Sequence, residues 1–407
     1  MPTSIPIGSP LARRVYGAAV FADTQRKPSF RKNLTGPAPK QGSAESKLRG
    51  QSSQDFPFVR VNDLEKTAGD TVTVDTFNII QGKPVMGDAK IAGKMMALTF
   101  DSMDVSIDQY RGGVDSGGRM TQKRTVHNLR GIAKANLAGY FSRLEDQLCL
   151  THVAGARGFE AGGDWVVPME TDPDFANIAV NAVNPPTFNR RFLAGTATSV
   201  ANLATTDFLT LTDIDRIRAQ IDEMPFPLQP IRIDGDADSD ENPLFCLYVT
   251  SRQWHYLQTN TSAQNWRTFI SNAHARSDGF NHPLFRGTPG MWNGILIKKM
   301  GRSVRFPAGS SVREYTLAGL ITPAVCAVDT DRAVLLGAQA LAEVYGRHGK
   351  SGHQADWSEI EVDHGNSVET VAAFMGGKSK IRFNDIDGVL TDHGVITIDS
   401  YAPAVTV

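Results

Sequence analysis

Apolar residues recur at steps of three and four positions in one long stretch of the chain, which is the pattern of a helix with one apolar face. The positions are Val126, Leu129, Ala133, Leu137, Tyr140, Leu144 and Leu148. We predict a helix from about Thr121, a suitable N-cap, to about Ala154, with Gly155 as its stop. At 1.5 Å per residue it would be roughly 50 Å long, a length that suits a strut.

A second pattern, in which apolar and polar residues alternate, predicts a long β-hairpin over residues 70–110. Val72 and Val74 alternate with polar residues in the first run, as Met103 and Val105 do in the second. The residues between the runs include Gly, Pro and Asp and have turn chemistry. The apolar phase shifts by one within each run, which predicts a bulge or bend. Because an isolated two-stranded hairpin is marginal in water, we expect this ribbon to find its support on another subunit.

The other patterns are short and mixed, which predicts an α+β fold without regular βαβ units. Residues 160–205 are irregular. Helices are expected at 213–223, with Thr212 as the N-cap, at 251–257 and at 265–275. Strands are expected at 244–249, 294–299, 312–317, 360–362, 380–383 and 395–398, and residues 333–345 are either strand or helix.

Charge is spread unevenly over the 407 residues, although the net charge is only −1. Residues 1–54 contain nine Lys or Arg and two acidic residues and carry +7, whereas the rest contains 33 basic and 41 acidic groups and carries −8. The basic segment is rich in Pro, Gly, Ser and Gln, so we expect an arm without a core of its own. Its partner is either nucleic-acid phosphate or the acidic surface of a neighbouring subunit. The interspersed apolar residues favour the neighbour: Val15, Tyr16, Val20, Phe21 and Phe30.

No motif predicts catalysis, a cofactor or a firmly bound metal. Gly349-Lys350-Ser351 and Gly377-Lys378-Ser379 lack the earlier glycine of a phosphate-binding loop. Residues 234–241 are acidic like a calcium loop, but Ser239 and Phe245 stand where Gly and Glu are needed, so only a loose cation site is left open.

The histidines near the C-terminus provide the main alternative function, a metal-dependent hydrolase. His348, His353, His364 and His393 lie among acidic residues there, but at no spacing typical of a metalloenzyme. The three cysteines, Cys149, Cys246 and Cys326, are expected to be buried and reduced. No apolar run reaches the roughly 18 residues of a membrane span, and the first residues lack a signal-peptide pattern, so we expect a cytoplasmic protein.

Several short stretches carry a resemblance to a known family. They are GKPVMGD from Gly82, VDSGGRMTQKRTVHNLR from Val114, RLEDQ from Arg143, HVAGARG from His152, NHPLFRGTPGMWNG from Asn281, AVLLGAQAL from Ala333 and DHGN from Asp363. In these stretches the chain resembles the major capsid proteins of short-tailed bacteriophages and related prophages. The resemblance covers roughly residues 67–400 and leaves the basic arm outside.

The resemblance implies the Hong Kong-type phage capsid fold, with an N-terminal arm, an extended loop, a peripheral domain and an axial domain. On this chain it implies an arm over 1–66, an extended loop over 67–112, a peripheral domain over 113–200 with a spine helix at 121–154, an axial domain over 201–345, and C-terminal strands over 346–407 that return to the peripheral domain.

The function implied by the resemblance is structural, with no catalysis and no cofactor. Pentamers and hexamers would close an icosahedral head shell around packaged double-stranded DNA, in the virion, after assembly in the host cytoplasm. Scaffolding, portal or decoration proteins are further partners left open, and a tail or connector protein is a second alternative. The expected subunit-interface residues are Gln81, Gly82, Lys83, Pro84 and Met86 of the ribbon and Arg26, Lys27, Arg31 and Lys32 of the arm.

Overall fold

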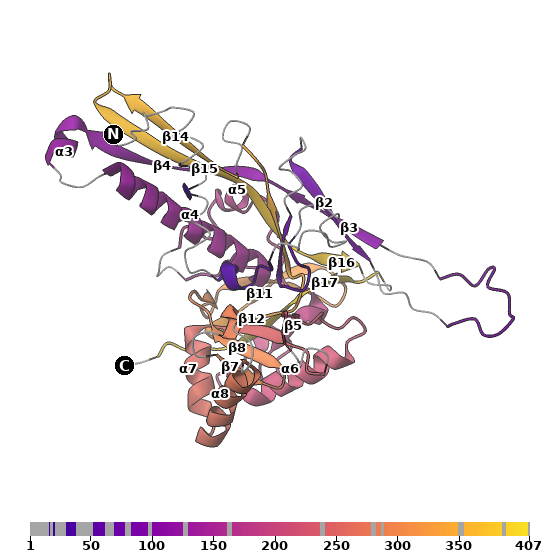
Figure 1. The fold of residues 1–407 in the computed structure, drawn as a ribbon. Coiled ribbons are helices and arrows are strands. Elements are labelled where there is room, and N and C mark those ends of the chain that lie inside the picture. The colour runs from indigo at the N-terminus through magenta and orange to yellow at the C-terminus, as the bar shows by residue number, and fades with distance from the viewer. Residues whose placement is uncertain are drawn as a thin grey trace.

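The computed structural model contains two large sheets, a long helix that runs along the first sheet and ends at the second, and a ribbon that projects from the body (Figure 1). It describes residues 16, 19–20, 30–37, 52–61, 69–77, 83–96, 100–124, 129–160, 165–236, 241–277, 282–285, 289–348, 354–384 and 388–405. The mixture of helices and sheets confirms the α+β prediction. Among the helices in these ranges, none combines the length and apolarity needed to cross a membrane.

The first sheet has five strands and forms the elongated end of the molecule (Figure 1). Its order is β1-β13-β15-β14, and β4 also pairs with β15. The β1–β13 pair is parallel and the others are antiparallel. The strands are β1 (Phe58–Val61), β4 (Asp108–Gly118), β13 (Leu341–Tyr345), β14 (Ala355–Val362) and β15 (Ser367–Lys380).

Helix α4 (Leu129–Ala154) is the predicted strut, and its apolar face packs on this sheet. Leu137 and Leu144 are buried there, and the ring of Phe141 lies 4.5 Å from that of Phe374 in β15, centroid to centroid. Near the end of the helix, Val153 enters a different core, against the second sheet. The helix therefore holds the two sheets in a fixed relation.

The predicted C-terminal end of the strut is correct, and its predicted N-terminal end is wrong. Gly155, with a φ of +68°, ends the helix in the left-handed conformation that favours glycine. Thr121 is not the N-cap, because it lies inside a separate helix, α3 (Arg119–Arg124), and residues 125–128 fall outside the described ranges. The 26 residues of α4 span about 39 Å, shorter than expected.

The second sheet has seven strands in the order β5-β18-β12-β6-β8-β7, with β9 paired to β12. β12 is buried along its whole length. Val334 and Leu336 face the core that α4 enters, and Ala333 and Leu335 face a core formed with three helices. The strands are β5 (Arg191–Leu193), β6 (Phe245–Val249), β7 (Gly290–Trp292), β8 (Ile295–Lys299), β9 (Val304–Phe306), β12 (Thr330–Leu336) and β18 (Val395–Tyr401). Residues 333–345 are thus strand, divided between β12 and β13.

The three predicted helices that cover this sheet are present as α6 (Leu211–Glu223), α7 (Ser251–Asn260) and α8 (Ala263–Ser277). The N-cap of α6 is Thr210, two residues before the predicted Thr212. Asp213 explains the choice, because its carboxylate accepts the backbone N–H of Thr210 while the Thr210 hydroxyl accepts that of Asp213. This reciprocal capping box requires three-residue spacing, which only Thr210 has.

The predicted ribbon is confirmed as β2 (Thr71–Phe77) and β3 (Phe100–Ser106). The antiparallel register runs without a shift between Thr71–Ser106 and Phe77–Phe100, so the predicted bulge is wrong for this pair. The ribbon base also has support within its own chain, contrary to expectation. Val72 and Val105 are buried against β1 and β13.

Two small sheets and five short helices complete the described part of the fold. They are β10 (Ser311–Tyr315) with β11 (Ile321–Val325), β16 (Arg382–Asn384) with β17 (Leu390–Asp392), η1 (Arg31–Asn33), α5 (Phe175–Ala179), η3 (Phe188–Arg190), η4 (Val200–Asn202) and η5 (Pro283–Phe285). The C-terminal strands divide between the sheets, because β14 and β15 join the first and β18 joins the second. The five domain boundaries stay a prediction.

Candidate assembly surfaces

The tip of the ribbon, residues 83–96, stands away from the body beyond β2 and β3 (Figure 1). Four of its large apolar side chains lie in solvent, with exposed fractions of 77% for Met86, 59% for Ile91, 78% for Met95 and 49% for Met96. Isolated exposed apolar residues are common, but four within eleven positions of one loop are typical of a surface that binds a partner.

The structure places the predicted ribbon residues as follows. Lys83, Pro84 and Met86 are exposed at the tip, and Gln81 and Gly82 lie outside the described residues. Sequence reasoning missed Ile91, Met95 and Met96. The available signal was a set of large apolar residues within turn-like sequence, where no strand or helix would bury them.

Of the predicted arm residues, the structure describes the side chain of Arg31, which is buried in its own chain. Arg31 begins η1 and is only 3% exposed, so the expected contact with DNA or a neighbour is wrong for this side chain. Arg26 and Lys27 lie outside the described residues, as does the side chain of Lys32.

A buried charge cluster holds Arg31. Its members are Arg31, Glu145, Glu343, Tyr345 and Lys378. Nη1 of Arg31 lies 2.5 Å from Oε2 of Glu145, and its Nε lies 3.7 Å from Oε1 of Glu343. Nζ of Lys378 lies 2.9 Å from Oε1 of Glu145. The Tyr345 hydroxyl donates to Glu145 at 2.8 Å and accepts from Arg31.

The electrostatics of the cluster keep Glu145 ionised. Burial alone would raise the pKa of Glu145, but the charges of Lys378 and Arg31, with hydrogen bonds from Lys378 and Tyr345, lower it to about 2. Burial also raises the pKa of the Cys149 thiol, which donates to Glu343 at 3.1 Å. Two buried cations meet two buried carboxylates, and the partly exposed Arg60 lies 3.8 Å from Oε2 of Glu343. Loss of either buried carboxylate therefore leaves buried positive charge without compensation. The cluster therefore fixes the arm to α4 and to the first sheet.

The described apolar residues of the arm also pack on their own chain. Val20 is buried in the α4 core, and Tyr16 lies against Trp357, with ring centroids 5.7 Å apart. The ring of Phe30 packs edge-on against that of Tyr248, with ring centroids 4.7 Å apart. The expectation that Val20 anchors a neighbour is therefore wrong, whereas Tyr16 and Phe30 are only half-buried and their contact with a neighbour stays a prediction.

The residues of the hydrolase alternative do not form a site. His393 is packed beside Phe383, and burial together with the charge of Arg190 lowers its pKa to about 4. His364 stands exposed in a turn. Within the described ranges, no three His, Cys, Asp or Glu residues are placed to hold a metal ion.

The other motifs weighed from the sequence have structural explanations. Lys378 lies in strand β15 and pairs with Glu145, so Gly377-Lys378-Ser379 forms no phosphate loop. Asp236 of the acidic loop pairs with Arg276 at 2.8 Å, and residues 237–240 lie outside the described ranges. All three cysteines are free and buried, as predicted.

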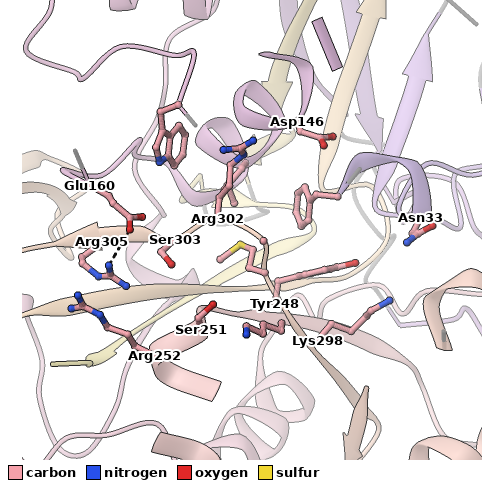
Figure 2. Close-up of a pocket in the computed structure, with 16 residues that line it drawn as sticks. Asn33, Asp146, Glu160, Tyr248, Ser251, Arg252, Lys298, Arg302, Ser303 and Arg305 are labelled. Atoms are coloured by element: carbon pink, nitrogen blue, oxygen red, sulfur yellow. Dashed lines mark hydrogen bonds and ion pairs between the residues drawn. The ribbon is translucent and has the colours of Figure 1, made fainter. Parts of the chain in front are cut away.

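A cavity of about 880 Å³ lies where η1, α4, β6 and β8 meet (Figure 2). Tyr248 and Ser251 line it, and Arg305 pairs there with Glu160 at 3.1 Å. The charged side chains of the lining are Arg252, Lys298, Lys299, Arg302 and Arg305 against Asp146 and Glu160. The excess of cations suits an anionic group. No sequence pattern could reveal this cavity, because its walls come from widely separated segments.

An exposed apolar tip beside well-packed cores is typical of a subunit that associates with other protein surfaces. Comparisons with known proteins identify the family. The chain belongs to the phage capsid protein family, whose model matches residues 4–404.

Individual relatives agree with the family. The major capsid protein of Pseudomonas phage KPP25 is 26% identical over 331 residues, which are 78% of this chain and 80% of that protein. The capsid of Ralstonia phage GP4 is 29% identical, with a TM-score of 0.72 and full coverage of both chains. The cyanophage Pam1 capsid shares the fold at 20% identity, with a TM-score of 0.58 over 86% of this chain and 90% of that one.

These findings confirm the Hong Kong-type phage capsid fold and the structural function. The chain is a major capsid protein, which forms the phage head shell and belongs to the virion. Its role is structural and not enzymatic, so both the hydrolase and the tail or connector alternatives are wrong.

Proposed function

We propose that copies of this chain form pentamers and hexamers, and that these close an icosahedral shell around packaged double-stranded DNA. Each ribbon tip lies on a neighbouring copy, where its apolar side chains leave water. Met86, Ile91, Met95 and Met96 together support this role, because a lone subunit would expose all four. Identical contacts repeated around an axis close a ring and limit the size of the assembly.

The DNA part of the proposal rests on charge. Residues 1–54 carry +7 on a chain whose other residues carry −8. Lys and Arg neutralise phosphates without reading sequence, which suits a shell that holds DNA of any sequence. Assembly in the host cytoplasm and contacts with scaffolding, portal or decoration proteins belong to the same proposal.

The test replaces the tip side chains without changing charge. Wild-type protein should form capsomers or closed shells in negative-stain microscopy, whereas Met86→Ser with Met95→Ser should leave folded subunits that do not assemble. Leu317→Ser is the matched control, because Leu317 is as exposed as Met86 but lies in the β10–β11 turn. Normal shells from the tip variant would reject the ribbon contact.

A further inference from the structure

The ribbon carries opposite charges at its two ends. Its base, residues 69–77 and 100–108, contains no Lys or Arg and five aspartates: Asp70, Asp75, Asp101, Asp104 and Asp108. Its tip, residues 83–96, contains Lys83, Lys90 and Lys94 against Asp88 alone. The base therefore carries −5 and the tip +2 within one hairpin.

The strand register places part of this charge on one outward face. Directly opposed residues of an antiparallel pair lie on the same face of the ribbon. Asp75 opposes Ser102 and Asp104 opposes Thr73, and all four are on the face opposite to the buried Val72–Val105 pair. The same face carries Phe100, which is 65% exposed. We call Asp75, Asp104 and Phe100 the outward base face; Asp70 and Asp108 are exposed at the end of the ribbon next to the body.

Among the residues that the structure describes, these carboxylates have no cationic partner. Among the described residues, none of the five aspartates forms an ion pair. Asp104 accepts a hydrogen bond from the Thr73 hydroxyl at 2.7 Å, and Asp101, on the inner side, accepts one from the backbone N–H of Asn384 at 2.8 Å. Like charges this close repel one another, so a cationic partner would stabilise the base.

The tip has the chemistry that this face requires. Lys83, Lys90 and Lys94 are exposed, as are Met86 and Met95. Lysine matches the aspartates in charge, and methionine makes favourable contacts with aromatic rings such as Phe100. The tip cannot reach its own base, because the seven residues of β2 alone span about 23 Å between them.

We infer that the ribbon tip of one copy binds the outward base face of the ribbon in a second copy. This inference rests on the proposed function, which places the tip on a neighbour, and it names the surface that receives it. The contact is head-to-tail, because two different patches of the same chain meet, and such contacts generate rings when the rotation closes.

The test is a charge exchange. The tip variant is Lys83→Glu, Lys90→Glu and Lys94→Glu, and the base variant is Asp70→Lys, Asp75→Lys and Asp104→Lys. Each variant alone should lose closed shells in negative-stain microscopy while circular dichroism shows folded subunits, because like charges would then meet. The chain that carries both sets should recover shells.

The matched control reverses the charge of acidic residues that lie outside the ribbon. Asp172→Lys and Asp174→Lys change two exposed carboxylates outside the ribbon, and combined with the tip variant they should not restore shells. Recovery with this control, failure of the combined chain to recover, or normal shells from the base variant would each overturn the inference and leave the proposed function standing. Normal shells from the Lys→Glu tip variant would also overturn the inference, whereas the proposed ribbon contact is tested separately by Met86→Ser with Met95→Ser.

Discussion

Arg332 of β12 and Asp399 of β18 form a two-point ion pair inside the second sheet. Nε of Arg332 lies 2.7 Å from Oδ1 and Nη2 lies 2.8 Å from Oδ2, with both side chains fully buried. The remaining Nη1 donates to the carbonyl of Ala154 at 3.0 Å, at the end of α4. One side chain thus joins strand, strand and helix, and it satisfies a carbonyl that the helix end leaves without a partner.

Removal of the Asp399 charge should therefore destabilise the subunit strongly. Asp399→Asn leaves Arg332 buried without a counter-ion, and the free energy of unfolding should fall by about 3–5 kcal/mol in urea titrations. Asp222→Asn is the control, because Asp222 is exposed and pairs with Arg218 on the surface of α6. The control should lower the free energy of unfolding by less than about 1 kcal/mol. Equal losses in the two variants would contradict the role given to the buried pair.

Leu144 on the apolar face of α4 supports a second prediction. Because Leu144 is 4% exposed in the core between α4 and the first sheet, Leu144→Ala should cost about 2–5 kcal/mol of unfolding free energy. Ile132→Ala, at an exposed position of the same helix, should cost about 0.5 kcal/mol or less. A small loss at Leu144, measured on the unassembled subunit, would mean that this face is not packed.

The lowered pKa of Glu145 predicts a loss of stability in acid. The folded pKa of about 2 lies below the ordinary 4.5, so the unfolded chain takes up the proton more readily. The resulting stabilisation, on the order of 3 kcal/mol, is fully present above about pH 4.5 and disappears as the pH falls toward about 2. Urea titrations across this range should show the loss in wild type and not in Glu145→Gln. Lys378→Met should move the loss to higher pH. An unchanged acid profile in Glu145→Gln would contradict the cluster.

The basic arm supports a prediction about filled particles. Since Tyr16, Val20 and Phe30 pack on their own chain, we expect the positive charge of the arm to be the feature that meets a partner, and we expect that partner to be DNA phosphate. Arg26→Gln, Lys27→Gln and Lys32→Gln together should leave empty shells intact and lower the temperature at which filled particles release DNA. Loss of the empty shells would instead identify an acidic neighbour as the partner.

Local patterns predicted local structure well in this chain. The three- and four-residue spacing that includes Leu137 and Leu144 identified the strut, because both residues pack on one sheet through one helix face. Alternation and turn chemistry identified the ribbon for the same reason. The cap of α6 was misplaced because two threonines compete there, and the carboxylate of Asp213 decides between them.

Contacts between distant segments could not be predicted in this way. Nothing next to Arg31 in the sequence reveals its partners Glu145 and Glu343, which lie more than a hundred positions away, so the sequence alone predicts an exposed side chain. The support of the ribbon base is also hidden from local patterns, because the strands that cover Val72 come from both ends of the chain. The resemblance to capsid proteins supplied the global arrangement that these local patterns lack.

The place of β18 sets the order in which a subunit can mature during synthesis. This strand lies between β5 and β12, so the interior of the second sheet stays open until residues 395–401 have left the ribosome. Asp399 arrives with them, and until then Arg332 has a buried place but no counter-ion. A nascent chain therefore cannot complete this core before its C-terminal strand has been synthesised.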